Sequence, residues 1–125
     1  MKTIISTEKA PAAIGPYSQG VAGEHIVFVS GQLPIDMTTG KMPETIEEQA
    51  KASLTNVRSI LEAKGLTMDN VVKTTVFLQN IDDFTAMNDV YKEFFTEGNY
   101  PARSAVEVAR IPKGAMLEIE AIALA

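Results

Sequence analysis

The sequence predicts an α+β fold: a mixed sheet of about six strands, with two helices packed on one face. The observations behind this are two segments with helical spacing, several short runs rich in β-branched residues, and the order strands, helix, strand, helix, strands. A chain of 125 residues has room for one domain, so residues 1–125 are expected to form a single unit. Two helices cover only one face of such a sheet. Because the strands show little polar alternation, the other face is expected to meet another subunit.

Two helices are predicted from their caps and their apolar spacing. Thr45 followed by Glu48 is a capping box, which satisfies free backbone donors at a helix start. This helix is expected to end at Lys64–Gly65, because glycine readily adopts the conformation of a C-cap. Asp82 or Asp83 is expected to cap the second helix. The apolar residues at helical spacing are Ile46, Ala50, Leu54, Val57 and Leu61 in the first helix, and Phe84, Met87, Tyr91 and Phe94 in the second.

The strands are predicted from runs of apolar and β-branched residues that end near Gly or Pro. The run Val71–Leu78 is apolar on both faces, which predicts a central strand. The sequence Ile111-Pro112-Lys113-Gly114 predicts a turn between the last two strands. The predicted strands are Lys2–Ser6, Tyr17–Val21, His25–Ser30, Val71–Leu78, Ala102–Ala109 and Met116–Leu124.

Composition and charge restrict the partners. The net charge of −5 and the scatter of the 11 basic residues argue against nucleic acid, because phosphate binding needs clustered Lys and Arg. No stretch approaches the roughly 20 apolar residues of a membrane span, and residues 1–10 lack the apolar core of a signal peptide. We therefore expect a small-molecule partner, no nucleic acid, no membrane and a cytoplasmic location.

Several kinds of chemistry lack the residues they need. The absence of cysteine excludes disulfides, thiolate catalysis and thiolate metal sites. His25 is the only histidine, so a histidine-based metal cage cannot form. Because His25 lies beside the start of a predicted strand, we expect a residue at the solvent edge or a cap and not the base of a Ser-His-Asp triad. No glycine-rich nucleotide-binding motif occurs. We therefore expect neither a metal nor a cofactor.

Charged residues on the last two strands are the main candidates for a site. Arg103, Ala105 and Glu107 fall on one face of their strand by the two-residue period. An arginine beside small residues leaves room for a carboxylate, which its planar guanidinium binds in bidentate fashion. A structural ion pair with a neighbouring glutamate is the alternative, and it is the more common arrangement. Glu118, on the last strand, either faces solvent or positions a water molecule in a pocket.

Two further polar residues are candidates. Asn88 lies one turn after Phe84, near the buried face of the second helix, so its amide needs partners from the backbone or from a ligand. Tyr17 follows Gly15–Pro16 in a rigid loop. Its hydroxyl either reaches a pocket or caps the edge of the sheet.

The separation of Arg103 and Glu118 restricts where a shared site can lie. If the last two strands form a tight hairpin about Lys113–Gly114, the two residues are about six positions apart, or roughly 20 Å at about 3.3 Å per residue. They then cannot share a small-molecule site in one hairpin. Either the strands are not neighbours in that register, or the pocket joins two subunits.

Four longer motifs stand out in the sequence: APAAIGPYSQG at 10–20, SGQ at 30–32, PARSAVEVAR at 101–110 and EIEA at 118–121. Together they resemble the reactive-intermediate deaminases, the RidA or YjgF family. The resemblance implies a chorismate-mutase-like fold that assembles as a homotrimer with active sites at subunit interfaces. It also implies hydrolysis of 2-imino and 2-enamino acids, such as 2-iminobutanoate and 2-iminopropanoate, to 2-oxo acids and ammonia.

The same resemblance implies roles for individual residues. Arg103 would grip the substrate carboxylate, and Glu118 would hold or activate the attacking water. Family members often carry cysteine where this chain has Ala105, so a thiol cannot be the nucleophile here. The residues implied to line the pocket are Tyr17, Ser30, Gly31 and Asn88, with backbone groups of Ala105.

Two other functions stay open. A non-catalytic trimer could bind small carboxylates through Arg103 and regulate a partner protein, and the missing thiol is compatible with that. A ribonuclease is implied by names used for relatives, but the acidic charge and the lack of a histidine pair make it the weaker hypothesis.

Overall fold

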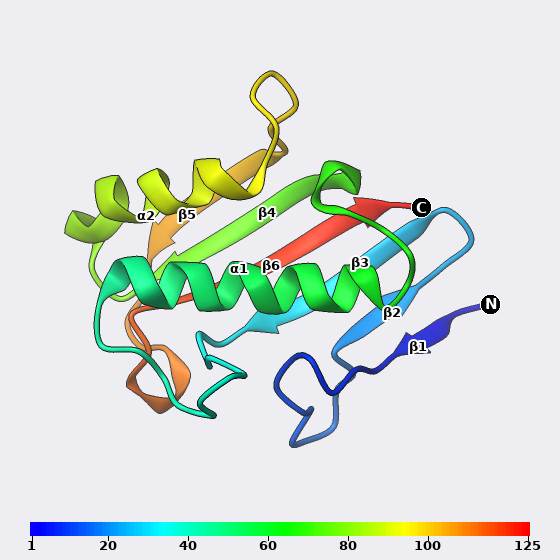
Figure 1. Cartoon of the computed structure of the whole chain (residues 1–125), viewed down its shortest axis with the longest axis horizontal. Helices are drawn as coiled ribbons and strands as arrows, with labels where there is room; N and C mark the ends of the chain where they lie inside the picture. The colour runs from blue at the N-terminus through cyan, green and yellow to red at the C-terminus, as the bar shows by residue number, and fades with distance from the viewer.

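The computed structural model describes all 125 residues. Its strands form one sheet in the order β1-β2-β3-β6-β4-β5, and both helices lie on the same face of this sheet (Figure 1). Only β4 and β5 are parallel, so the sheet is mixed. The predicted fold class is confirmed. The elements are β1 (Thr3–Ile5), β2 (Gly20–Ala22), β3 (Ile26–Gln32), α1 (Ile46–Glu62), β4 (Val71–Leu78), α2 (Phe84–Tyr91), β5 (Ala102–Glu107) and β6 (Leu117–Leu124).

Helix α1 begins where the sequence predicts. The Thr45 side chain accepts a hydrogen bond from the backbone N–H of Glu48 at 3.2 Å, as an N-cap does. After the helix, Gly65 adopts a left-handed conformation with φ of 80°, which glycine accepts without steric cost. Helix α1 buries Leu54, Val57 and other apolar residues against the sheet.

The predicted cap of α2 is wrong. Asp83 makes no side-chain cap hydrogen bond. The side chain of Asn80 instead accepts from the backbone N–H of Asp82 at 2.9 Å, which starts a 3-10 turn at Ile81–Asp83 ahead of the helix. Helix α2 ends at Tyr91, and Lys92–Phe94 continues as a second 3-10 turn.

Strand β2 begins at Gly20, later than predicted, because the residues before it belong to a loop. Ser30 of β3 holds the end of this loop, because its backbone N–H donates a hydrogen bond to the Gln19 carbonyl at 2.9 Å, outside the paired residues of β2. Strand β3 runs on to Gln32, with an irregular register between Val29 and Gln32. The other strand predictions are accurate to within a few residues.

Strands β5 and β6 are not neighbours, so the hairpin considered above does not form. Strand β4 lies between them, antiparallel to β6 and parallel to β5. The crossover through α2 returns the chain beside β4, on the edge of the sheet, as parallel pairing requires. The turn at Pro112–Gly114 then carries the chain to the other side of β4 (Figure 1).

The two faces of the sheet differ in what covers them. Leu117 and Ile119 of β6 are fully buried in the core between sheet and helices, while Glu118 and Glu120 alternate onto the other face. We call that other face the open face, because neither helix covers it (Figure 1). It exposes large apolar side chains, among them Phe28 at 48% and Val106 at 44%. Neither α1 nor α2 is long and apolar enough to cross a bilayer.

Candidate active site

Arg103 lies on β5, at the edge of the sheet, beneath helix α2. It pairs with Thr74 of β4 and shares the helix-covered face with it. Its Nη1 donates a hydrogen bond to Asn88 Oδ1 at 2.7 Å. The guanidinium carbon lies 4.7 Å from the centre of the Tyr91 ring and 5.3 Å from that of Phe84. Three side chains of α2 therefore hold the guanidinium in place.

No carboxylate neutralises Arg103. The ion pairs of the chain are His25–Glu24 and Lys92–Asp89, both on the surface. A structural ion pair was the alternative interpretation of Arg103, and it is wrong. The half-buried guanidinium is therefore available to bind an anionic ligand, and it borders a shallow cavity of about 350 Å³. The cavity is lined by Asn88, Asp89, Tyr91, Lys92, Tyr100, Pro101 and Arg103.

Glu118 lies on the open face, paired with Phe77 of β4. Its carboxyl group occupies the space that a side chain at position 31 would fill, since a Cβ on Gly31 would come within 2.9 Å of Glu118 Cδ. Partial burial raises the pKa of Glu118, and the like charge of Glu120 raises it further. This carboxyl group therefore exchanges a proton nearer neutral pH than an ordinary glutamate. A cavity of about 180 Å³ beside it is lined by Phe77, Val108, Arg110, Ile111, Pro112 and Glu118.

Ser30 joins β3 to the loop that carries Tyr17. The Ser30 hydroxyl donates to the Ser18 carbonyl at 2.6 Å, so it holds the loop rather than pointing freely into a pocket. Tyr17 remains 52% exposed. Since Ser30 precedes Gly31, and Gly31 contacts Glu118, these residues form one continuous region.

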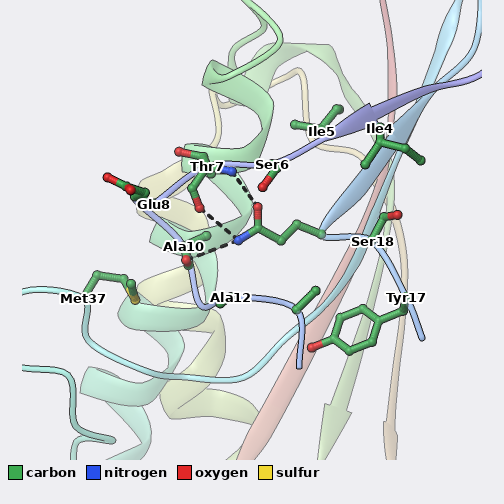
Figure 2. A pocket seen from close by; sticks show the side chains of 12 residues that line it. Ile4, Ile5, Ser6, Thr7, Glu8, Ala10, Ala12, Tyr17, Ser18 and Met37 are labelled. Carbon is green, nitrogen blue, oxygen red and sulfur yellow. Dashed lines mark hydrogen bonds between the residues drawn. The ribbon is translucent and has the colours of Figure 1, made fainter. Parts of the chain in front are cut away.

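Gln19 organises the loop between β1 and β2, and it was missed in the sequence. Its buried side chain accepts from the Thr7 backbone N–H at 2.7 Å and donates to the carbonyls of Thr7, Ala10 and Pro11. The surrounding segment lines the cavity shown in Figure 2, where the hydrogen bonds to Thr7 and Ala10 are drawn and Tyr17 lies at the rim. The position of Gln19 in the motif GPYSQG was the only signal.

The predicted site residues fall into two groups on opposite faces of the sheet. Arg103, Asn88 and Ala105 belong to the helix-covered face, while Glu118 belongs to the open face. The two groups do not meet within one chain. No cluster of three or more potential metal-ligating His, Asp or Glu residues occurs.

Two residues that contact Arg103 were predicted from the sequence only as core residues. Phe84 and Tyr91 were predicted correctly as the apolar face of a helix, yet both also contact Arg103. Their spacing carried a usable signal, because Phe84, Asn88 and Tyr91 lie four and three residues apart and so share one helical face.

Comparison with known proteins identifies the family. The family model described as endoribonuclease L-PSP matches residues 7–125. The chain belongs to this family. The RidA (YjgF) resemblance is thereby confirmed, since relatives in the same group carry the deaminase name. The 2-iminobutanoate/2-iminopropanoate deaminase of Salmonella typhimurium is 53% identical, over 99% of this chain and 98% of the relative. The protein of the same name from Escherichia coli is 52% identical with the same coverage.

Solved structures of the family share the fold. The crystal structure of Escherichia coli TdcF with bound serine superposes with a TM-score of 0.93 at 48% identity, covering 98% of both chains. The YjgF gene product of Escherichia coli gives a TM-score of 0.93 at 52% identity, again over 98% of both chains.

Proposed function

We propose that this chain hydrolyses reactive 2-imino and 2-enamino acids, such as 2-iminobutanoate and 2-iminopropanoate, to 2-oxo acids and ammonia. The observation that carries the proposal is the half-buried guanidinium of Arg103, which no carboxylate of its own chain neutralises. Relatives more than half identical over nearly the whole chain are named deaminases of these two imines. A family structure that holds serine adds that an amino acid, with its α-carboxylate, fits this scaffold.

The residues suit this substrate class. A 2-imino acid carries a carboxylate beside an electrophilic carbon, so an Arg103 fixed in space both selects the substrate and orients that carbon. Strand β5 adds a second group: it lies at the sheet edge, and the backbone N–H of Val108 points toward β4. By alternation, the N–H of Ala105 points outward, where it can meet the same carboxylate. This role needs no side chain, so alanine serves in place of cysteine.

Glu118 supplies the proton transfer in the proposed mechanism. As a carboxylate it accepts a proton from the attacking water while oxygen bonds to the imine carbon. With a protonated imine as the substrate, Glu118 returns this proton to the nitrogen of the tetrahedral intermediate. It then accepts the proton of the new hydroxyl group as the carbon–nitrogen bond breaks, so that ammonia leaves and the 2-oxo acid remains. Because burial raises its pKa, Glu118 releases and recovers this proton at a higher pH than an ordinary glutamate does.

The working unit is proposed to be a homotrimer with sites between subunits, in the cytoplasm, where pyridoxal-phosphate enzymes release such imines. Arg103 and Glu118 lie on opposite faces of the sheet in one chain, so a site that contains both takes them from two copies. The apolar side chains of the open face and the unpaired edge of β5 provide surfaces for that association.

A direct assay tests the activity. A dehydratase generates the imine, semicarbazide traps what remains, and the rate of imine loss is compared with and without this protein. We expect faster imine loss with the wild-type protein, and no acceleration over the protein-free rate with Arg103→Ala at unchanged oligomeric state. The absence of any acceleration by the wild-type protein would reject the deaminase proposal.

A non-catalytic carboxylate-binding regulator is the second candidate, since the Arg103 site also fits that role. Such a protein binds 2-oxo acids but leaves the decay of imines unchanged, so the same assay separates the two. Ribonuclease activity, which the family description suggests, has the acidic net charge of −5 against it.

A further inference from the structure

The guanidinium of Arg103 must be held in a defined orientation to bind a carboxylate well. An arginine on an edge strand has a long side chain with several rotatable bonds, and freezing it costs entropy each time a ligand binds. Binding of a carboxylate through two parallel hydrogen bonds also requires a defined guanidinium plane. Asn88 fixes one end of the group through Nη1 but does not by itself define the plane.

Tyr91 provides the closer of the two ring contacts that can define this plane, since the Phe84 ring centre lies farther away, at 5.3 Å. The Tyr91 ring face lies 4.7 Å from the guanidinium carbon, within the range of a cation–π contact, and its side chain is buried. The Tyr91 ring also packs against Phe95, and the two ring centres are 4.7 Å apart. A planar cation that rests on a fixed ring face keeps its own plane.

Thr74 fixes the ring in turn. The Tyr91 and Thr74 hydroxyl oxygens are 2.6 Å apart in a buried hydrogen bond. Thr74 is also the direct neighbour of Arg103 across the parallel β4–β5 pair. One strand position thus supports Arg103 twice, through the backbone and through the Tyr91 ring. Burial raises the pKa of the Tyr91 hydroxyl, so the ring stays neutral under physiological conditions.

We propose that Tyr91, held by its hydrogen bond to Thr74, is a positioning residue that fixes the guanidinium plane of Arg103 and thereby sets the affinity for the substrate carboxylate. This inference rests on the proposed function, because it takes Arg103 as the carboxylate anchor. It assigns work to two residues that the sequence motifs of the family resemblance did not include.

A double-mutant cycle tests the proposal with little change in volume. Tyr91→Phe and Thr74→Val each remove one hydroxyl, and the double variant removes both. The dissociation constant for 2-oxobutanoate is measured by titration calorimetry, and the melting temperature is measured on the same preparations. Each single variant leaves a buried hydroxyl without its partner and should lower the melting temperature, whereas the double variant should recover most of that loss.

Affinity is expected to behave differently from stability. Because both single variants and the double variant break the same hydrogen bond, each should weaken 2-oxobutanoate binding by about threefold to tenfold, without addition in the double variant. In turnover, KM should rise while kcat stays within about twofold, as expected for lost uniform binding. Affinity that recovers together with stability in the double variant, or wild-type affinity in all three variants, would overturn the proposal.

The chain offers a matched control. Arg58 lies 5.1 Å from the centre of the Phe94 ring, a similar contact away from the Arg103 cavity. Phe94→Leu should therefore leave the affinity for 2-oxobutanoate unchanged. Arg103→Ala distinguishes a failure of Arg103 as the carboxylate anchor from a failure of the positioning role of Tyr91. If it binds 2-oxobutanoate like the wild type, both the anchor and the present inference fail. If it loses binding while the Tyr91 and Thr74 variants bind normally, only the present inference fails.

Discussion

At the scale of single residues, the two charged groups of the site have opposite environments. Arg103 rests on aromatic rings and an amide, all of which tolerate a permanent cation without neutralising it. Glu118 is half-buried beside a like charge, so its ionised form is disfavoured. The first arrangement suits a group that binds an anion and keeps its charge. The second suits a group that gains and loses a proton, which is the division of labour that imine hydrolysis needs.

Gly31 is expected to be essential because its missing side chain makes room for Glu118. In Gly31→Ala the new Cβ meets Glu118 Cδ at 2.9 Å, so the carboxyl group must move. A shift of this size in a catalytic group should lower kcat about tenfold to a hundredfold. Gly23→Ala is the control, since the nearest atoms to a Cβ there are a methyl group of Ile26 at 3.3 Å and the Ile26 carbonyl oxygen at 3.7 Å. Equal activity of the two variants in the imine assay would contradict this role of Gly31.

Glu118 is expected to cost stability at neutral pH. Its pKa in the folded chain lies above the ordinary value of 4.5, so the folded state holds the proton more tightly than the unfolded state. Stability therefore falls as the pH rises from 4.5 through the raised pKa, and the full cost applies above it. Glu118→Gln carries no such charge. It should melt at a higher temperature than the wild type at about pH 7.5, with the difference vanishing at about pH 4.

The control for this pH dependence is Glu97→Gln, which removes an exposed carboxylate from a loop. Glu97→Gln should show no comparable rise in melting temperature at neutral pH. A Glu118→Gln variant with the same advantage at both pH values would indicate a packing effect instead of a charge effect. Because the same substitution should abolish imine hydrolysis, the stability gained and the activity lost have one physical origin.

At the scale of elements, the sequence predicted correctly those features that depend on interactions between residues close together in the chain. The cap at Thr45, the extent of β4 and the alternation of buried and open residues on β6 follow from short-range rules, and the structure confirms them. The cap of α2 was wrong because the chain enters the helix through a 3-10 turn, and Asn80 caps that turn. The place of β5 was not predictable from the turn sequence, since a crossover through α2 decides it.

The candidate site shows the same difference between features set by local sequence and features set by tertiary packing. Arg103 and Asn88 were named from the sequence as separate candidates, but the hydrogen bond between them depends on how α2 packs over β5. The aromatic contacts of Tyr91 depend on the same packing. Gln19 was invisible for another reason: its partners are backbone groups of the loop, which no side-chain pattern reveals.

The loop between β1 and β2 is expected to depend on Gln19. Gln19→Leu keeps a similar volume but leaves buried backbone groups without partners, which should cost about 2–4 kcal/mol of unfolding free energy. Gln79→Leu is the matched control, because Gln79 is exposed and its side chain makes one hydrogen bond, at 3.3 Å. It should cost less than about 0.5 kcal/mol. Urea unfolding of both variants measures the difference, and similar costs would show that the loop does not rely on this side chain.

At the scale of the whole molecule, one chain holds both halves of the proposed site but cannot bring them together. Arg103 belongs to the helix-covered face and Glu118 to the open face, with β4 between their strands. The exposed Phe28 and Val106 mark the open face as a surface that association would bury. Both features point to a site made by two copies, with Arg103 from one and Glu118 from the next.

Mixing two inactive variants tests this arrangement. Arg103→Ala and Glu118→Gln should each be inactive alone. In a closed trimer that contains both variants, one of the three interfaces combines the intact Arg103 of one chain with the intact Glu118 of its neighbour. About three quarters of the trimers from an equal mixture contain both chains, so refolding the mixture should restore about a quarter of wild-type activity.

The same experiment distinguishes a site within one chain from a site between chains. If each chain formed its own complete site, every chain in the mixture would still carry one defect, and activity would stay absent at any ratio. The variants mixed without unfolding provide the control, because preformed assemblies cannot exchange chains unless they dissociate. Activity that appears only after joint refolding, and that peaks at an equal ratio, is the result expected when neighbouring copies complete one another's sites.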